Sequence, residues 1–178
     1  MWEQYKALSG RNFDDHDYFC YHTPVPRLVE KAHQHLMKHN EQTHLSAETI
    51  AEHIQPSLIY GRQLGNGYSA SLYVTLASLL DHANQDLANK RIGFYSYGSG
   101  CVAEFFSGIV QPEYKKMLNT TQHQSLLAER KALSYSEYET FYSFKYPQDG
   151  SLCEIPSYKT GPFRLVAIRE HRRIYERA

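Results

Sequence analysis

The sequence has few cysteines and no surplus of either charge. Its 178 residues include three cysteines, Cys20, Cys101 and Cys153, which are widely spaced and form no CxxC pair. A disulfide framework is therefore not expected, and the pattern favours a reducing cytoplasm. Nineteen lysine and arginine residues balance nineteen aspartate and glutamate residues. We expect no nucleic-acid partner, because binding phosphates requires a basic surplus.

Long apolar runs are also missing. No stretch approaches the roughly 20 apolar residues of a membrane helix, and the charged segment Met1–Gly10 is unlike a signal peptide. We therefore expect a soluble, cytoplasmic protein with no membrane partner. The acidic group Asp14, Asp15 and Asp17 has no histidine at ligand spacing, so no metal is expected. What the sequence does contain is aromatic residues: fifteen tyrosines and eight phenylalanines suit large buried or interface surfaces.

Apolar spacing predicts alternating strands and helices in the first part of the chain. We predict a helix over residues 1–9 and a strand at Asp17–Tyr21. The next helix is predicted to have Thr23 as its N-cap and Pro24 at its first position. Its apolar stripe consists of Val25, Leu28, Val29, Ala32 and Leu36. The predictions that follow are a helix from Ser46 to about Ile54, a loop at Gly61–Gly67 and a buried helix at Ser69–Asp81.

The second part of the chain is predicted to continue with a hairpin. Strands at Arg91–Tyr97 and Cys101–Val110 are joined by Gly98-Ser99-Gly100, whose glycines permit a tight turn. The remaining predictions are helices over 112–133 and 134–144, a turn-rich segment at 147–161 and a final strand at Phe163–Arg169. This alternation indicates one layered α/β domain over residues 1–178.

Three short motifs contain polar groups that suit catalysis or binding. His22 stands at a predicted strand-to-helix junction, a favourable place for an acid or base. Asn66 lies between two glycines, where its amide can donate to a thioester oxygen. Ser99 lies between two glycines at the hairpin tip. Each motif taken alone also fits a simpler interpretation: a structural or surface histidine, a loop asparagine, and a plain hairpin turn.

A cysteine nucleophile is an alternative source of chemistry. Strand alternation places Cys20 on the same side as His22, and Cys101 directly follows the Gly-Ser-Gly turn. A small, buried and inert cysteine is nevertheless the commoner occupant of a strand.

Taken in order, these motifs resemble the 3-hydroxy-3-methylglutaryl synthase family. The resemblance covers nearly the whole chain in four segments: Asn12–Ala32, Gly65–Tyr73, Gly93–Ser107 and Leu165–Tyr175. It implies an α/β architecture that forms the C-terminal portion of a thiolase-like fold, with αβα layers and a mixed sheet. The family's complete fold has two similar halves and is normally a homodimer, so this portion is incomplete without the N-terminal half.

The resemblance also implies an acyltransferase that condenses an acetyl thioester with a β-ketoacyl thioester. His22 would bind and polarise the acceptor thioester or its ketone. The implied substrate-binding residues are Asn66, Tyr97, Gly98 and Ser99. Arg27 and Lys31 are candidates to bind the phosphate of CoA or phosphopantetheine, or else belong to a solvated polar face. No resident cofactor is implied, because the thioesters are substrates.

The resemblance has one important gap. The family's nucleophilic cysteine and glutamate base lie in the N-terminal half, so this chain alone is not expected to form an acyl-enzyme. Val25 and Arg27 resemble the polyketide β-branching members, whose acceptor is carried on an acyl carrier protein. The alternatives are a mevalonate-pathway enzyme that uses acetoacetyl-CoA, and a non-catalytic partner subunit with a thiolase fold.

Overall fold

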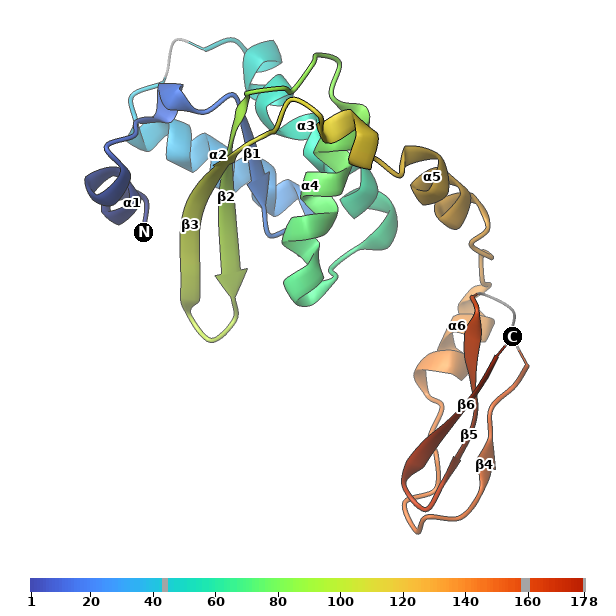
Figure 1. The fold of residues 1–178 in the computed structure, drawn as a ribbon. Coiled ribbons are helices and arrows are strands. Elements are labelled where there is room, and N and C mark those ends of the chain that lie inside the picture. Colours follow the sequence, from blue (N-terminus) through green and yellow to red (C-terminus); the bar gives the residue numbers. More distant parts are fainter. Residues whose placement is uncertain (43–44, 158–160, 178) are drawn as a thin grey trace. The chain divides into compact units, whose positions relative to one another are not determined.

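The structure is a computed structural model that describes residues 1–42, 45–157 and 161–177. The chain divides into unit 1, Met1–Glu129, and unit 2, Arg130–Ala178. Figure 1 labels the helices, which are α1 (Trp2–Ser9), α2 (Pro26–His39), α3 (Ala47–Leu64), α4 (Ser71–His82), α5 (Thr120–Ala128) and α6 (Tyr135–Tyr142). The strands are β1 (Tyr18–Tyr21), β2 (Arg91–Gly98), β3 (Val102–Ile109), β4 (Cys153–Glu154), β5 (Phe163–Arg169) and β6 (Arg172–Arg177). No helix in the described ranges is long and apolar enough to cross a membrane.

Unit 1 is built on a mixed three-stranded sheet in the order β1-β2-β3. β1 runs parallel to β2, and β2 pairs antiparallel with β3 as the predicted hairpin. Gly93 in β2 leaves room for two aromatic rings, because an added Cβ atom would lie 2.9 Å from both Phe19 and Phe105. The predicted α/β class and mixed sheet are therefore confirmed.

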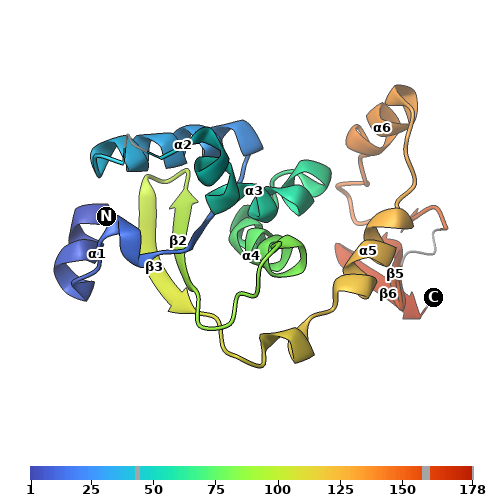
Figure 2. The ribbon, with the colours of Figure 1, turned by 90° about the horizontal axis from the view of Figure 1, so that it is seen from above.

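Helices cover both faces of this sheet (Figure 2). Alternation along β1 turns Phe19 and Tyr21 towards α2 and α3, where they pack with Val29 and Leu58. The intervening Cys20 faces α4 on the opposite side. α3 contacts β1, α2 and α4. The core of unit 1 therefore consists of two apolar layers on either side of a central sheet.

The predicted start of the second helix is wrong. α2 begins at Pro26 with Val25 as its N-cap, and no side chain caps it. Thr23 lies outside the helix, and its hydroxyl donates to the carbonyl of Tyr21. The reason is that Pro26 disfavours helical geometry at Val25, which is extended (φ −146°, ψ 130°), so the first helical position is Pro26 and not Pro24.

α3 is longer than predicted. It starts as expected after Ser46, whose hydroxyl accepts from Thr49 N, but it continues past Ile54 to Leu64, so the loop predicted at Gly61–Gly67 begins only at Gly65. Pro56 lies inside this helix. The buried Ser78 hydroxyl donates to Pro56 O (2.6 Å) and accepts from Tyr60 N (3.2 Å). It thereby provides hydrogen-bond partners for two backbone groups of α3 next to the proline.

Three further boundaries differ from the predictions. β3 starts at Val102, because Cys101 has a left-handed φ of 59° in the turn. The helix predicted over 112–133 is reduced to a 3₁₀ turn at Tyr114–Met117 and to α5. The turn-rich segment contains the short strand β4, although residues 158–160 lie outside the described residues.

Unit 2 contains α6 and a separate antiparallel sheet in the order β4-β5-β6. α6 starts as predicted after Ser134, which forms a capping box with Glu137. β5 matches the predicted strand at Phe163–Arg169, but it is not the final one, because β6 pairs along it. This division into units does not test the prediction that residues 1–178 form one thiolase-like domain.

Candidate functional site

His22 extends β1 by one residue at the end of the sheet. Its backbone N–H donates to Tyr95 O at 2.7 Å, so the parallel pairing with β2 continues past Tyr21. The side chain is half-buried and lies on the same side of the strand as Cys20. Because β2 continues from Tyr95 to Gly98 at the hairpin tip, this pairing brings His22 to the end of the sheet that carries the tip.

A pocket of about 650 Å³ brings the predicted substrate residues together. His22, Asn66, Tyr97, Gly98 and Ser99 all line it. They come from the end of β1, the loop before α4 and the β2–β3 turn, which are far apart in the sequence. These residues therefore meet at one pocket, as a shared substrate site requires, while their roles in binding and catalysis stay predictions.

The loop that carries Asn66 presents its amide nitrogen as a donor. Gly65 ends α3 with a left-handed φ of 72°, and Asn66 Oδ1 accepts from Tyr68 N at 2.9 Å. This hydrogen bond orients the amide and leaves the Nδ2 group able to donate to a ligand. Asn66 and Ser99 are exposed, so the pocket is open in this chain.

Sequence reasoning missed the aromatic and acidic walls of this pocket. Tyr68, Tyr73, Glu104 and Phe106 line it as well. Strand alternation could have identified Glu104 and Phe106, since they share one face of β3 with Val102. Tyr68 could not be placed in this way, because it has a left-handed φ of 51° at the start of the 3₁₀ turn Tyr68–Ala70.

Arg27 and Lys31 do not line the pocket that contains His22. Both are exposed on α2, and Arg27 pairs with Glu30 at 2.6 Å. Lys31 lines a different cavity of about 600 Å³, together with Trp2 and Tyr95. Their predicted contact with a phosphate therefore stays a prediction.

The cysteines offer no nucleophile beside His22. All three are free thiols. Cys20 is fully buried, and burial raises the pKa of its thiol to about 12, which keeps it protonated. Cys101 is exposed in the turn after Ser99 but does not line the pocket. In the described part of the chain, no group of three or more histidine, cysteine, aspartate or glutamate residues could hold a metal ion.

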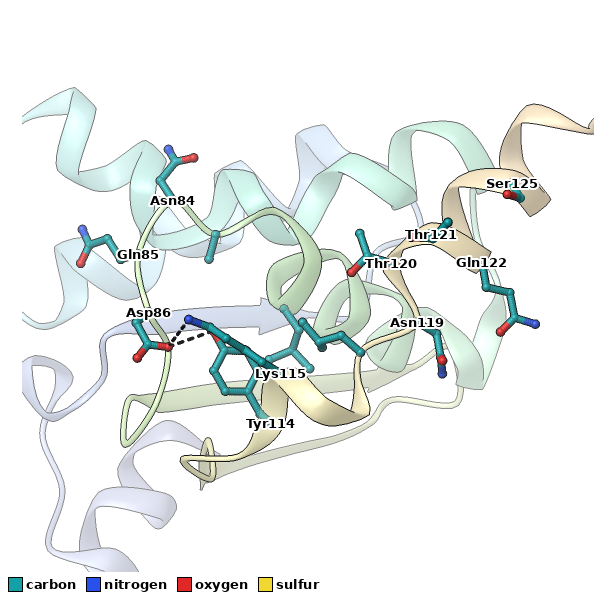
Figure 3. A pocket seen from close by; sticks show the side chains of 13 residues that line it. Asn84, Gln85, Asp86, Tyr114, Lys115, Asn119, Thr120, Thr121, Gln122 and Ser125 are labelled. Carbon is teal, nitrogen blue, oxygen red and sulfur yellow. Dashed lines mark hydrogen bonds and ion pairs between the residues drawn. The ribbon is translucent and has the colours of Figure 1, made fainter.

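Unit 1 has a larger pocket, of about 970 Å³, that lacks catalytic features (Figure 3). Its carboxylate, Asp86, forms an ion pair with Lys115 Nζ at 3.1 Å and accepts a hydrogen bond from the Tyr114 hydroxyl. The other labelled side chains are neutral amides and hydroxyls. Since Asp86 is already paired, we assign the candidate site to the smaller pocket around His22.

Comparisons with known proteins agree on one family. The family model described as hydroxymethylglutaryl-coenzyme A synthase C terminal matches residues 38–177. The hydroxymethylglutaryl-CoA synthase of Enterococcus faecalis is 39% identical over 143 residues, which is 80% of this chain and 37% of that protein. The polyketide biosynthesis 3-hydroxy-3-methylglutaryl-ACP synthase PksG of Bacillus subtilis (strain 168) is 37% identical over 143 residues, or 79% and 34% of the two chains.

A solved structure shows the same fold. The crystal structure of an HMG-CoA synthase complexed with CoA matches with a TM-score of 0.86 and 33% identity, over 99% of this chain and 45% of that chain. This likeness confirms the predicted thiolase-like α/β fold. The chain spans less than half the length of each of these three proteins.

Proposed function

The chain belongs to the family described as hydroxymethylglutaryl-coenzyme A synthase C terminal, and on that premise we propose that it forms the acceptor-thioester site of an acyltransferase. The reaction condenses an acetyl thioester with a β-ketoacyl thioester. The acetyl methyl carbon loses a proton and forms a bond to the β-ketone carbon of the acceptor. The ketone oxygen gains negative charge and is then protonated to a hydroxyl group.

The observation that supports this proposal is the shared pocket of His22, Asn66 and Ser99. A developing alkoxide is stabilised by donors that are already in place before the reaction. In our proposal the His22 imidazole polarises the acceptor carbonyl, while the Asn66 amide and the Ser99 hydroxyl donate to the thioester from the pocket walls. Losing one such donor typically costs about 10²–10³ in rate.

The acyl-enzyme step is proposed to lie outside this chain. By the resemblance, the nucleophilic cysteine and the glutamate base belong to an N-terminal half of the same fold, and the complete enzyme forms a homodimer. The exposed apolar side chains Tyr73 (67%) and Val102 (73%) beside the pocket are suited to contact with that half. Intact mass spectrometry after incubation with acetyl-CoA should show no adduct. An acetylated cysteine in the 178-residue chain would contradict this part of the proposal.

We favour an acceptor carried on an acyl carrier protein, as in polyketide β-branching. The similarity to PksG supports this choice. The exposed basic side chains Arg27, Lys31 and Lys38 along α2 suit the phosphate of either acceptor, because CoA carries the same phosphopantetheine arm. The similarity to the Enterococcus faecalis enzyme favours the alternative, free acetoacetyl-CoA. Titrating the chain with both forms of acceptor decides between them: equal or tighter binding of the CoA ester contradicts our choice.

Calorimetric titration with acetoacetyl-pantetheine tests the role of His22. Loss of one hydrogen bond to the thioester in His22→Ala should weaken binding by about tenfold. The matched control is His35→Ala, an exposed histidine of α2 outside this pocket, which should bind like the unchanged chain. Equal affinity of His22→Ala and the unchanged chain would refute the assignment. Absence of any binding by the unchanged chain would instead favour a non-catalytic partner subunit.

A further inference from the structure

The backbone next to His22 cannot satisfy its own hydrogen bonds locally. Thr23 is followed by Pro24 and then, two residues later, by Pro26, and neither proline has an N–H group. Thr23 is 1% exposed, so water does not reach its backbone groups. An unpaired N–H or C=O group in such a position costs as much as a lost hydrogen bond. Both groups therefore need partners from elsewhere in the chain.

Ser71 supplies both partners with one hydroxyl group. Its Oγ accepts from Thr23 N at 3.0 Å and donates to Thr23 O at 3.0 Å. The side chain is 3% exposed and does not line the pocket. Thr75, one turn further along α4, places its hydroxyl 3.4 Å from Tyr21 O on the other side of His22. The proton of Thr75 has a closer acceptor in Leu72 O at 2.6 Å, so it is Ser71 that holds the peptide groups next to His22.

This clamp connects the segments that form the candidate site. Ser71 is the first residue of α4 and closely follows the loop that carries Asn66. His22 N–H pairs with Tyr95 O, which leads along β2 to Ser99. One short stretch, Tyr21–Thr23, is thus tied to the Asn66 loop by Ser71 and to the hairpin by its own backbone.

We propose that Ser71 is a positioning residue that sets the place of the His22 imidazole relative to Asn66 and Ser99. The proposal rests on the function proposed above, because it concerns the same pocket. Removing the hydroxyl leaves two buried backbone groups of Thr23 without partners. The backbone then shifts to regain them, and His22 moves with it. Ser71 acts through His22 and does not contact the substrate.

Ser78 provides a matched control on the same helix. It lies two turns after Ser71, is fully buried, and also makes two hydrogen bonds through its hydroxyl. Its partners are in α3, at Pro56 O and Tyr60 N, and not next to His22. Ser71→Ala and Ser78→Ala should therefore lower the free energy of unfolding by similar amounts. A change seen in Ser71→Ala alone then reflects an effect on His22 and not a general loss of packing.

The decisive measurement is nitrogen NMR of the histidine side chains in the full 178-residue chain. For Ser71→Ala we expect shifted His22 imidazole signals and about tenfold weaker binding of acetoacetyl-pantetheine. Ser78→Ala should leave both readouts unchanged, and Ser71→Thr, which keeps the hydroxyl, should restore them. If Ser71→Ala does not fold, Ser71→Cys keeps the volume but replaces the hydroxyl with a weak donor.

Two outcomes would overturn the proposal. Either the Ser71 variants leave the His22 signals unchanged, or Ser78→Ala changes them to the same extent. A failure of the proposed function would give a different result from a failure of the Ser71 proposal. In that case His22→Ala would bind the thioester as tightly as the unchanged chain does. The imidazole signals still report on Ser71 in that case, since they need no ligand.

Discussion

The two units of the chain differ in how much they bury. In unit 1, Phe19, Leu58 and Leu79 are at most 1% exposed and belong to two apolar clusters. In the described part of unit 2, Ala167 is the one buried hydrophobic residue. Large aromatic side chains there lie at the surface, including Tyr142 (79%) and Phe163 (65%).

The comparison shows why the candidate site lies where it does. A pocket formed by three separate segments requires a packed scaffold that holds each segment still. Unit 1 provides that scaffold through its central sheet and the helices on both faces. Unit 2 consists of α6 and a sheet that bury little apolar surface, so it depends on contacts beyond its own residues for stability.

The largest expected difference between the units comes from removing one aromatic ring in each. Phe19→Ala removes a ring that is 1% exposed and packs against Phe13 and Gly93, so it should cost about 3–5 kcal/mol of unfolding free energy. Phe163→Ala, at 65% exposure, should change it by less than about 0.5 kcal/mol. Urea unfolding measures both. Equal costs would show that the units do not differ in packing.

A smaller effect is expected at the end of unit 1. Asp81, with a side chain 1% exposed, accepts from the Tyr60 hydroxyl (2.6 Å), the Thr120 hydroxyl (2.6 Å) and His123 Nδ1 (2.7 Å). Burial disfavours its ionised form, but these donors outweigh that effect and lower the pKa of Asp81. Because α5 has no buried residue of its own, the contacts to Asp81 hold it in place.

Asp81→Asn should therefore loosen α5, at a cost of about 1.5–3 kcal/mol, the range for hydrogen bonds to a charged group. Hydrogen exchange should accelerate in α5 while the strands of unit 1 keep their protection. Asp86→Asn is the control, since Asp86 is exposed and pairs with Lys115 at the surface. If the amides of α5 exchange equally fast in both variants, the contacts to Asp81 do not hold α5 in place.

Acid should destabilise unit 1 through His33. This side chain is fully buried, with Nδ1 2.8 Å from the Tyr21 hydroxyl and Nε2 3.4 Å from His53. Burial, and secondarily His53, lowers the pKa of His33 from 6.5 to about 3. As the pH falls below 6.5 the unfolded chain binds a proton that the folded chain does not. The stability is therefore unaffected above that pH and decreases below it.

Between pH 7 and pH 5 the expected loss is about 2 kcal/mol from His33. Urea unfolding at the two pH values measures it. His33→Gln should flatten this dependence, whereas His35→Gln, at an exposed position of the same helix, should not. A pH dependence that survives in His33→Gln without change would contradict the assignment.

The smallest effect concerns which unit the proposed carrier protein contacts. Lys31→Glu, on the exposed face of α2 in unit 1, should weaken binding of an acetoacetyl-carrier protein by about fivefold, typical of a surface charge. Lys145→Glu makes the same change in unit 2 and should have no effect. Titrating both variants with the acetoacetyl-carrier protein at two salt concentrations measures the two affinities and their dependence on charge. The reverse pattern would move the carrier contact to unit 2.

The sequence predicted the elements that build the site better than their boundaries. The hairpin followed from the glycines at 98 and 100, and β1 starts one residue later than predicted but ends at Tyr21 as predicted. The start of α2 was wrong because Pro26 keeps Val25 out of helical geometry, which moves the first helical position from Pro24 to Pro26. The length of α3 depends on Ser78, a partner distant in the sequence that supports the helix beside Pro56.

The site itself was predicted by resemblance more than by local chemistry. His22, Asn66 and Ser99 each fit a structural interpretation alone, and only tertiary pairing brings them to one pocket. β6 was missed because Arg172, Arg173 and Arg177 hide its alternation, and it is recognisable only from its pairing with β5. Tyr68 entered the pocket through a backbone conformation that no periodicity signals.

A crystal structure of the chain with a bound acetoacetyl thioester would test the central claim most directly. Our account predicts electron density in the pocket between β1 and the hairpin, with an acceptor oxygen within hydrogen-bonding distance of His22 and with Asn66 and Ser99 against the same ligand. Density for the thioester at another site, with His22 untouched, would contradict it.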